Sequence, residues 1–340
     1  MTYKDSFISY GMVATPLREV DPGTERAQAS YRPFLDALRA AAEPTRLRLL
    51  GILARCELTV TEITQVLGQS QPRVSRHLRV LCDAGLLDRV PEGSWVFYRL
   101  ADRRVARTFV DMLGDDDPTL ADDRERLAAV QRARQDAADS YFQQHAHEWN
   151  DIRSLHAPEE EVERALLTLV GDQPVGDLLD IGTGTGRIAG LLAPRASRVV
   201  GIDRSHEMLA IARAALAGRE YRHVQLRHGD MYHLAVPARS MDLIVLHQVL
   251  HFADDPVAVL REIARVLRPG GRLLLADFAP HSEESLRDQH AHRRLGFATD
   301  DITHWGAAAG LRAREAVRLT GSPLTVVIWD CSLPNRTATA

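Results

Sequence analysis

The 340-residue sequence is poor in cysteine and in lysine. Its three cysteines, Cys56, Cys82 and Cys331, are far apart and form no Cys-x-x-Cys pair. This spacing excludes a dense disulfide framework and argues against a zinc ribbon. Lys4 is the only lysine among 42 basic residues, so arginine carries nearly all of the positive charge.

Long hydrophobic runs are also missing. No apolar stretch reaches the roughly 18 residues that a transmembrane helix needs, and the polar N-terminus lacks the apolar segment of a secretory signal. We therefore expect a cytoplasmic protein. The chain is 45% hydrophobic and 26% charged, which predicts a buried core. Its net charge of -4 argues against a protein that coats nucleic acid with a uniformly basic surface.

Composition and periodicity divide the chain into four segments, two of them domains. Residues 1–30 show no period and are expected to be a flexible leader. Residues 31–112 read as short helices followed by a hairpin. Residues 113–140 contain an acidic, proline-marked break and a polar helical linker. Residues 141–335 alternate strand-like apolar runs with helical stretches, which is the pattern of an α/β fold.

The first domain is predicted to contain three helices and a hairpin. Helices are expected over 44–53, over 60–67 and after Ser70, where the apolar spacing is helical. The segments 86–90 and 94–100 flank a Pro-Glu-Gly turn and predict two paired strands. Helix, turn, helix and hairpin in this order are typical of a winged helix.

The third helix has two chemically different faces. Val74, Leu78 and Leu81 follow one another at i, i+4 and i+7 and predict a buried stripe. Between residues 71 and 107, eight arginines stand against four acids, a local net charge of +4. Such a helix suits the acceptor-rich major groove, although a packing helix with a solvated arginine face is the alternative. The predicted DNA-contacting residues are Gln71, Arg73, Ser75, Arg76, His77, Arg79 and Arg99.

Residues 44–100 resemble the winged-helix ArsR/SmtB family of bacterial repressors through EPTRLRLLGIL, ELTVTEI and QSQPRVSRHLRVLCDAGLLDR. The resemblance implies a homodimer on an inverted DNA repeat, with the third helix in the groove and the hairpin on the DNA backbone. Family members bind soft metals through two thiolates where this chain has Thr59 and Thr61. Hydroxyls are poor ligands for such metals, and residues 101–113 contain no histidine for a second family site. We expect no metal site.

A glycine-rich turn follows the first predicted strand of the second domain, over 177–181. Gly182, Gly184 and Gly186 form a Gly-x-Gly-x-Gly pattern that lets a ligand approach the backbone closely. The next predicted strand ends at Asp203, whose carboxylate can accept hydrogen bonds from both hydroxyls of a ribose. Further strands are predicted over 224–231, 241–246 and 272–278, and over 313–319 and 324–331, which would form a closing hairpin.

The motifs DIGTGTG, GID, GDM and LRPGG occur in the order found in class I S-adenosylmethionine-dependent methyltransferases. The chain resembles their small-molecule branch, which includes ubiquinone and menaquinone biosynthesis enzymes, over roughly 140–335. The resemblance implies S-adenosylmethionine as cofactor, held by Tyr141, Asp180, Gly182, Thr183, Gly184, Gly186, Asp203, Arg204, Met208, Asp230, Met231 and His247. The expected fold class is an N-terminal α+β winged helix-turn-helix and a C-terminal α/β Rossmann-like sheet with a closing β-hairpin.

The chemistry beyond cofactor binding is less determined. His247 and His251 follow the fourth strand and can act as a base or as wall residues. Arg293 and Arg294, after the fifth strand, suit an acidic substrate. The absence of an Asn/Asp-Pro-Pro-Tyr motif disfavours methylation of DNA bases or protein amides, and no cysteine cluster supports arsenite as acceptor.

The sequence thus predicts a DNA-binding transcriptional regulator, a repressor, that carries a methyltransferase domain acting on a small-molecule acceptor. Its expected partners are double-stranded operator DNA, the acceptor and a second copy of the chain, with no membrane. Two alternatives stay open. The second domain could only sense S-adenosylmethionine or S-adenosylhomocysteine, or the protein could be an enzyme that uses the winged domain only for dimerisation.

Overall fold

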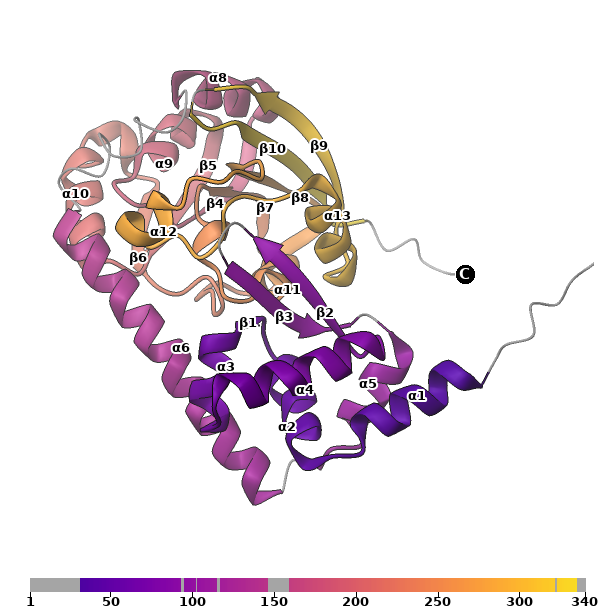
Figure 1. Cartoon of the computed structure of the whole chain (residues 1–340). Helices are drawn as coiled ribbons and strands as arrows, with labels where there is room; N and C mark the ends of the chain where they lie inside the picture. The colour runs from indigo at the N-terminus through magenta and orange to yellow at the C-terminus, as the bar shows by residue number, and fades with distance from the viewer. Residues whose placement is uncertain are drawn as a thin grey trace, which may run out of the picture.

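The computed structural model describes most of the chain outside its two ends, and the leader predicted at residues 1–30 lies outside the described part. Two domains are stacked one above the other, and one long helix runs along both of them (Figure 1). The described residues are 31–92, 95–101, 103–114, 117–145, 159–321 and 323–334.

The N-terminal domain is a winged helix. Its small sheet has the antiparallel order β1-β3-β2, so β2 and β3 form the predicted hairpin. The three predicted helices are confirmed as α2, α3 and α4. The elements are α1 (Arg32–Ala41), α2 (Pro44–Leu53), β1 (Leu58–Thr59), α3 (Val60–Leu67), α4 (Gln71–Asp83), β2 (Leu87–Glu92), β3 (Trp95–Leu100) and α5 (Arg104–Asp111).

Local signals explain where these helices begin and end. Thr59 caps α3 in a reciprocal arrangement with Glu62, in which each side chain accepts from the other residue's backbone N–H. Gly68 ends α3 in the left-handed conformation, with φ of 64°. Val74 and Leu78 of α4 are fully buried, as the apolar stripe predicts.

The helix α6 (Pro118–His145) connects the two domains. It packs against α2 and α3 in the N-terminal domain and against α10 in the C-terminal domain. Near its start, Asp123 is buried and its carboxylate accepts from Arg48 at 2.6 Å. The predicted linker therefore belongs to a helix that packs against both domains, and that helix includes Tyr141 near its end.

The C-terminal domain contains a seven-stranded sheet of order β6-β5-β4-β7-β8-β10-β9. The strands β4 to β8 pair in parallel, and β10 is antiparallel to both of its neighbours. The predicted class I sheet and its closing hairpin are confirmed. The strands are β4 (Val175–Ile181), β5 (Ala196–Asp203), β6 (Val224–His228), β7 (Met241–His247), β8 (Leu267–Phe278), β9 (Arg312–Leu319) and β10 (Val326–Ser332).

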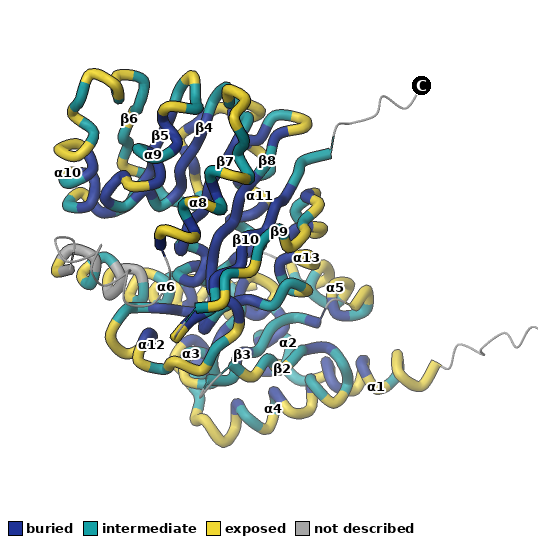
Figure 2. The backbone as a smooth tube through the Cα atoms, turned by 90° about the horizontal axis from the view of Figure 1, so that it is seen from above, coloured by how far each residue is buried: buried dark blue, intermediate teal, exposed yellow. Residues whose placement is uncertain are grey.

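Helices cover both faces of this sheet. Apolar residues of α8 and α9 pack on one face, and those of α11 and α13 pack on the other. Figure 2 shows the central strands as the most buried part of the molecule. The main helices are α8 (Glu159–Val170), α9 (Arg187–Leu192), α10 (His206–Ala215), α11 (Pro256–Val266), α12 (Ser285–His290) and α13 (Thr299–Ala308).

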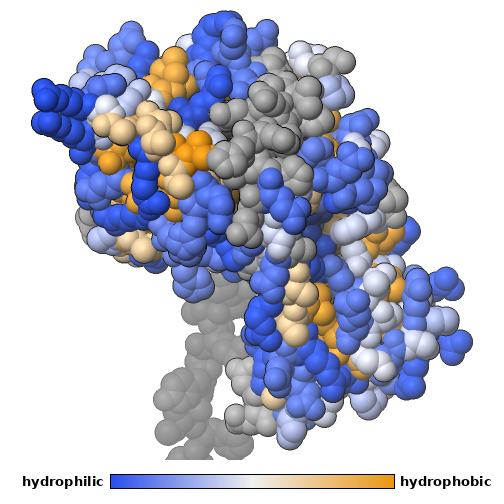
Figure 3. All heavy atoms as spheres, turned by 90° about the vertical axis from the view of Figure 1, so that its left-hand side faces the viewer, coloured by the Kyte–Doolittle hydropathy of each residue, from blue (hydrophilic) through white to orange (hydrophobic). Residues whose placement is uncertain are grey.

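The surface is mainly polar on the side that carries α6 and α10, where hydrophobic areas are small and separate (Figure 3). Among the described residues, no helix is both long and apolar enough to cross a membrane.

Candidate cofactor and acceptor cavity

A cavity of about 490 Å³ opens where β4, β5 and β7 end. The carboxyl ends of parallel strands are where open α/β sheets bind their ligands. The volume lies in the range of pockets that enclose small molecules. Its lining comes from both domains, so the cavity is described below first on its C-terminal side and then on its N-terminal side.

The predicted glycine turn forms one wall of the cavity. Gly182, Gly184 and Gly186 all have positive φ, a conformation that favours glycine. A Cβ at Gly182 would overlap the side chain of Val249, so the close packing also requires glycine. The hydroxyl of Thr183 donates to Asp180 at 2.7 Å and holds that carboxylate at the strand end. The turn thus leaves its backbone open to a ligand.

Asp203 lies at the end of β5, as predicted, and lines the cavity. Its carboxylate oxygens accept from the backbone N–H groups of Gly184 at 2.8 Å and Ser205 at 2.9 Å. Burial raises the pKa of Asp203, and the backbone donors partly offset this effect. The carboxylate is therefore held rigidly beside the glycine turn.

Arg204 connects the cavity to α6. Its guanidinium forms ion pairs with Asp139 of α6 at 2.9 Å and with Asp230 at 3.3 Å. Asp230 also accepts from the backbone N–H of Tyr232 at 2.8 Å. Burial raises the pKa of Asp139, against the opposing effect of Arg204. Asp230 supports the wall in this way but does not line the cavity.

Apolar side chains form the part of the wall expected to contact an adenine. Met208 is buried in α10, and Met231, Ile188 and Ile202 line the cavity beside it. Ser205 fixes the start of α10 by accepting from the N–H of Met208. Of the twelve residues assigned by resemblance to the cofactor, all line the cavity except Gly186 and Asp230.

The two candidate histidines occupy different surroundings. His247 is buried at the end of β7 and lines the cavity. His251 does not line the cavity, and its Nδ1 is 2.7 Å from the carboxylate of the buried Asp277. Its ring stacks on that of His292, with centroids 3.9 Å apart. Of the two, only His247 is placed to meet a ligand.

Tyr141 brings the end of α6 to the cavity, where the sequence predicted it. Its hydroxyl is 2.6 Å from Nδ1 of His290 in α12. Burial raises the pKa of Tyr141 to about 12, so its hydroxyl stays protonated at neutral pH.

The N-terminal domain also contributes to the cavity, which the sequence did not predict. Glu62 of α3, Trp95 of β3 and Arg134 of α6 are among the residues that line it. The sequence contained a signal for this contact. Trp95 and Phe97 are two positions apart in a strand, so their side chains lie on the same face of the hairpin. Large apolar side chains in that pattern indicate a surface that packs against something else.

The hairpin is fixed to the C-terminal domain by Arg287 of α12. This arginine pairs with Glu92 at 2.6 Å, and its side chain is only 1% exposed. Its guanidinium carbon lies 4.7 Å from the centroid of the Trp95 ring. The backbone N–H of Leu295 also donates to Glu92, at 2.6 Å.

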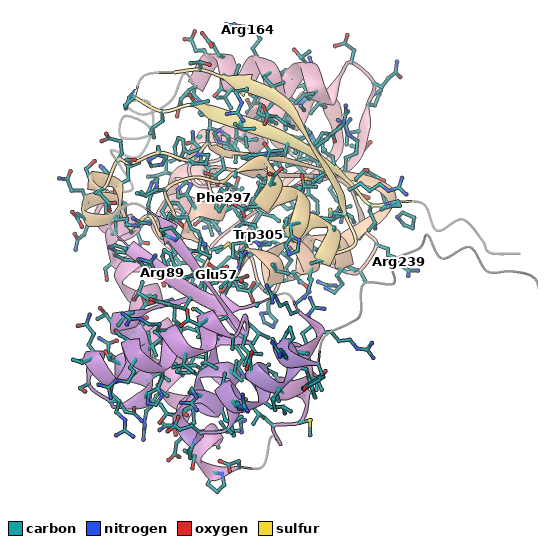
Figure 4. All side chains as sticks on the ribbon, turned by 45° about the vertical axis from the view of Figure 1, so that its right-hand side comes forward. Glu57, Arg89, Arg164, Arg239, Phe297 and Trp305 are labelled. Atoms are coloured by element: carbon teal, nitrogen blue, oxygen red, sulfur yellow. The ribbon has the colours of Figure 1, made fainter. Side chains whose placement is uncertain are left out.

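Arg293, which lines the cavity, and Arg294 are both paired with carboxylates. Arg293 pairs with Glu62 at 3.1 Å and with Asp254 at 3.0 Å, and Arg294 pairs with Glu57 at 2.9 Å. Both arginines are buried and neutralised in the contact between the domains. Glu57 lies at this boundary, below Trp305 of the C-terminal domain (Figure 4).

The carboxylates of this contact stay charged. Burial acts to raise the pKa of Glu57, but Arg294 and Arg99 hold it below its usual range. The pKa of Glu62 is lowered in the same way, by Arg293 and Arg134 against the effect of burial. A charged, paired contact therefore joins the winged helix to the methyl-transfer fold at neutral pH.

Six of the residues predicted to contact DNA lie on α4, and most of them are exposed to solvent. Gln71, Arg73, Arg76 and Arg79 are exposed, whereas Ser75 is half-buried. His77 is half-buried too, with Nδ1 3.5 Å from Glu43, and burial lowers its pKa. Figure 2 shows α4 and α1 on the outside of the domain, with many exposed positions.

Arg99 is the exception among the predicted DNA-contacting residues. It is half-buried and pairs with Glu57 at 3.4 Å and with Asp88 at 3.5 Å. The hairpin that carries it points toward the C-terminal domain (Figure 1). In this arrangement Arg99 supports the contact between the domains, and the end of the hairpin is engaged there too.

Comparison with known proteins agrees with both parts of this architecture. The family described as "Bacterial regulatory protein, arsR family" matches residues 43–89, and the "Methyltransferase domain" family matches residues 179–275. The chain is 26% identical over 204 residues to the ubiquinone biosynthesis O-methyltransferase of Aeromonas salmonicida. That match covers 54% of this chain and 84% of that protein.

Two further likenesses concern the second domain. An arsenite methyltransferase of Halobacterium salinarum is 33% identical over 166 residues, covering 46% of this chain and 42% of that protein. The crystal structure of the N-methyltransferase NodS of Bradyrhizobium japonicum, in complex with S-adenosyl-L-homocysteine, is 21% identical with a TM-score of 0.44. It covers 53% of this chain and 89% of that one.

The fold and the cavity define a winged helix joined to a class I methyltransferase sheet. More particularly, the chain carries an ArsR-family regulatory domain followed by an S-adenosylmethionine-dependent methyltransferase domain.

Proposed function

We propose that this protein is a DNA-binding transcriptional regulator whose second domain methylates a small molecule. The observation that carries the proposal is the extent of the cavity. Its lining includes the glycine turn and Asp203, which suit the cofactor, and also Trp95 and Phe252, which are not among the residues assigned to the cofactor. A site that served only to sense the cofactor would not require these additional lining residues.

The cofactor half fits S-adenosylmethionine by its chemistry. The open glycine backbone suits the methionine part, Asp203 suits the ribose hydroxyls, and Met208 and Met231 suit the adenine. When bound, S-adenosylmethionine supplies an electrophilic methyl group, which the acceptor takes while the sulfur keeps the electron pair of the broken bond. The protein's part is to align the acceptor and to exclude water. His247 is placed to hold the acceptor or to take its proton.

Arsenite is disfavoured as acceptor, as the sequence predicted. All three cysteines of the chain are free, and Cys56 and Cys331 are buried. Burial raises the pKa of each of these two thiols to about 12, so neither is a thiolate at neutral pH. Soft metalloids bind thiolates, and the cavity offers none.

DNA binding is supported by the exposed arginines of α4. They stand on a helix whose opposite face is buried, so the helix is held while its outer face is free to enter a groove. Dimerisation is supported by exposed apolar side chains on α1 and after α5, two helices that contact each other. These are Tyr31, Phe34, Leu38 and Met112.

Cofactor binding is tested by calorimetric titration with S-adenosylhomocysteine. We expect the wild-type protein to bind it and Asp203→Ala to bind at least tenfold more weakly, because the ribose hydroxyls lose their acceptor. Asp172→Ala is the matched control, since that carboxylate is fully exposed at the surface. Equal affinity in all three proteins would contradict the assigned site.

Turnover is tested separately with S-adenosylmethionine labelled in its methyl group, incubated with a small-molecule extract of the producing cells. Transfer of label to a product, absent with Asp203→Ala, supports the enzyme. Tight S-adenosylhomocysteine binding with no transfer to any extract component would instead favour the sensor alternative.

DNA binding is tested by fluorescence anisotropy on DNA from upstream of the gene. Absence of specific binding to this DNA would favour the alternative that the protein is only an enzyme.

A further inference from the structure

One part of the cavity wall, called the acceptor half below, contains residues of the winged helix. Trp95 and Glu62 reach it from β3 and α3, and Arg134 reaches it from α6. Phe252 and His292 complete this half from the C-terminal domain. A molecule bound beside the cofactor would therefore touch the DNA-binding domain directly.

Trp95 is held in a defined position at this end. Glu92, three residues before it, is anchored by Arg287, and the same guanidinium lies against the Trp95 ring. The guanidinium carbon of Arg293 lies farther away, 5.9 Å from the ring centroid. An aromatic ring fixed in this way at a cavity is suited to stack against a flat ligand.

The charged groups at this end are already paired. Arg134 pairs with Glu62 and, at 2.6 Å, with Asp254. Arg293 shares both of these carboxylates, and Arg287 pairs with Glu92 and Glu284. These three guanidinium groups stand against four carboxylates, so a ligand carboxylate would meet no excess of positive charge at this part of the cavity.

We propose that the winged helix forms one wall of the acceptor site and that the acceptor is a flat, uncharged, aromatic molecule stacked on Trp95. This inference rests on the proposed function of the second domain and specifies its substrate class. Trp95 is then a residue that determines acceptor specificity, although it belongs to the DNA-binding domain.

The test uses two probes of the same shape and different charge, 2-naphthol and 2-naphthoate. At neutral pH the phenolic group is uncharged and the carboxylic acid is ionised. Binding of each is measured by equilibrium dialysis to the full-length protein saturated with S-adenosylhomocysteine. We expect wild-type protein to bind 2-naphthol at least fivefold more tightly than 2-naphthoate.

Variants at Trp95 isolate the role of the ring. Trp95→Ala is expected to lower the affinity for 2-naphthol at least fivefold and to leave the affinity for S-adenosylhomocysteine unchanged. Trp95→Phe is expected to bind 2-naphthol within twofold of the wild-type affinity. Arg89→Ala, an exposed change on the same hairpin, is the matched control and should bind as wild type does. If Trp95→Ala loses S-adenosylhomocysteine binding through misfolding, Trp95→Leu, which keeps more apolar volume than alanine and has no aromatic ring, replaces it in the comparison.

The possible results separate this inference from the proposed function. No binding of 2-naphthol, equal binding by the Trp95 variants, or preference for 2-naphthoate overturns the inference while leaving the cofactor site in place. Failure of the wild-type protein to bind S-adenosylhomocysteine counts instead against the proposed function.

Discussion

The two parts of the winged helix that the sequence assigns to DNA have different surroundings in the structure. The helix α4 presents Arg73, Arg76 and Arg79 to solvent. The β2–β3 hairpin instead packs on the methyltransferase domain, with Glu92 and Trp95 held by Arg287. A motif therefore specifies its own local fold, while the rest of the chain decides which of its surfaces are free.

The difference has a consequence for DNA binding. The face of α4 is available without any rearrangement, whereas a hairpin contact with the DNA backbone would require the buried ion pairs of Arg287 and Arg294 to open. Opening such pairs leaves charges that lack partners in a poorly solvated contact. We expect α4 to carry most of the DNA affinity.

The largest effect is expected from reversing the charge that holds the hairpin. Arg287→Glu would place a carboxylate against Glu92 and remove the cation from Trp95. Removing one partner of a buried pair costs about 3–5 kcal/mol, and we expect a loss of that order in the free energy of unfolding, measured in urea. Adding Glu92→Arg to Arg287→Glu restores opposite charges and should recover part of the loss. No recovery in the double variant would show that the pair does not anchor the hairpin.

The second largest effect is expected on α4, the part of the winged helix that is exposed to solvent. Arg76→Ala is expected to lower affinity for operator DNA by about 1–3 kcal/mol, because an arginine at a groove contributes that much. Anisotropy at fixed salt measures it. Arg164→Ala removes the same charge from an exposed site at the far end of the C-terminal domain (Figure 4) and should leave the affinity unchanged. Equal losses in the two variants would mean that only net charge matters.

The third effect is a loss of stability in acid, which we expect from His281 in the C-terminal domain. Burial lowers the pKa of His281 to about 4, with His251 and Arg287 adding to the effect and Asp277 opposing it. Between this value and the ordinary histidine pKa of about 6.5, the unfolded chain binds a proton that the native protein does not. Stability therefore rises with pH across this window, and the loss at pH 5 relative to pH 7 is at most about 2 kcal/mol from this group.

Urea unfolding at the two pH values measures this dependence. His281→Gln should show a smaller loss between pH 7 and pH 5 than the wild-type protein, because the titrating group is gone. His304→Gln, at an exposed position, serves as the control and should keep the wild-type dependence. An unchanged pH dependence in His281→Gln would contradict the assignment.

The smallest effect is expected at Arg99. Its guanidinium is engaged with Glu57 and Asp88, so Arg99→Ala should change DNA affinity less than twofold while slightly lowering the stability of the contact between the domains. The same anisotropy titration, run beside Arg76→Ala, measures it. A loss as large as that of Arg76→Ala would show that the hairpin leaves the methyltransferase domain and reaches DNA.

Much of the architecture could be predicted because its signals are local. The apolar spacing of Val74, Leu78 and Leu81 predicted the buried face of α4, and the glycines after β4 predicted a turn that a ligand can approach closely; in the structure these glycines have positive φ. Strand ends, caps and turns depend on residues a few positions apart. The cofactor half of the cavity, built from such strand ends, was therefore also largely predictable.

The acceptor half of the cavity could not be predicted from the sequence, and Arg293 shows why. Its partner Glu62 is 231 residues away in the sequence, and nothing in either segment indicates that they meet. Read alone, Arg293 and Arg294 suggested an acidic ligand; in the folded chain they neutralise carboxylates of the other domain.

The sequence by itself thus determined the two domain folds, the arginine-bearing face of α4 and the glycine and carboxylate positions of the cofactor site, because each follows from short-range periodicity and backbone conformation. Only the tertiary structure decided that the hairpin is docked and that Trp95 and Glu62 enter the cavity. The physical reason is that burial and charge pairing depend on which distant segments meet when the two domains pack together.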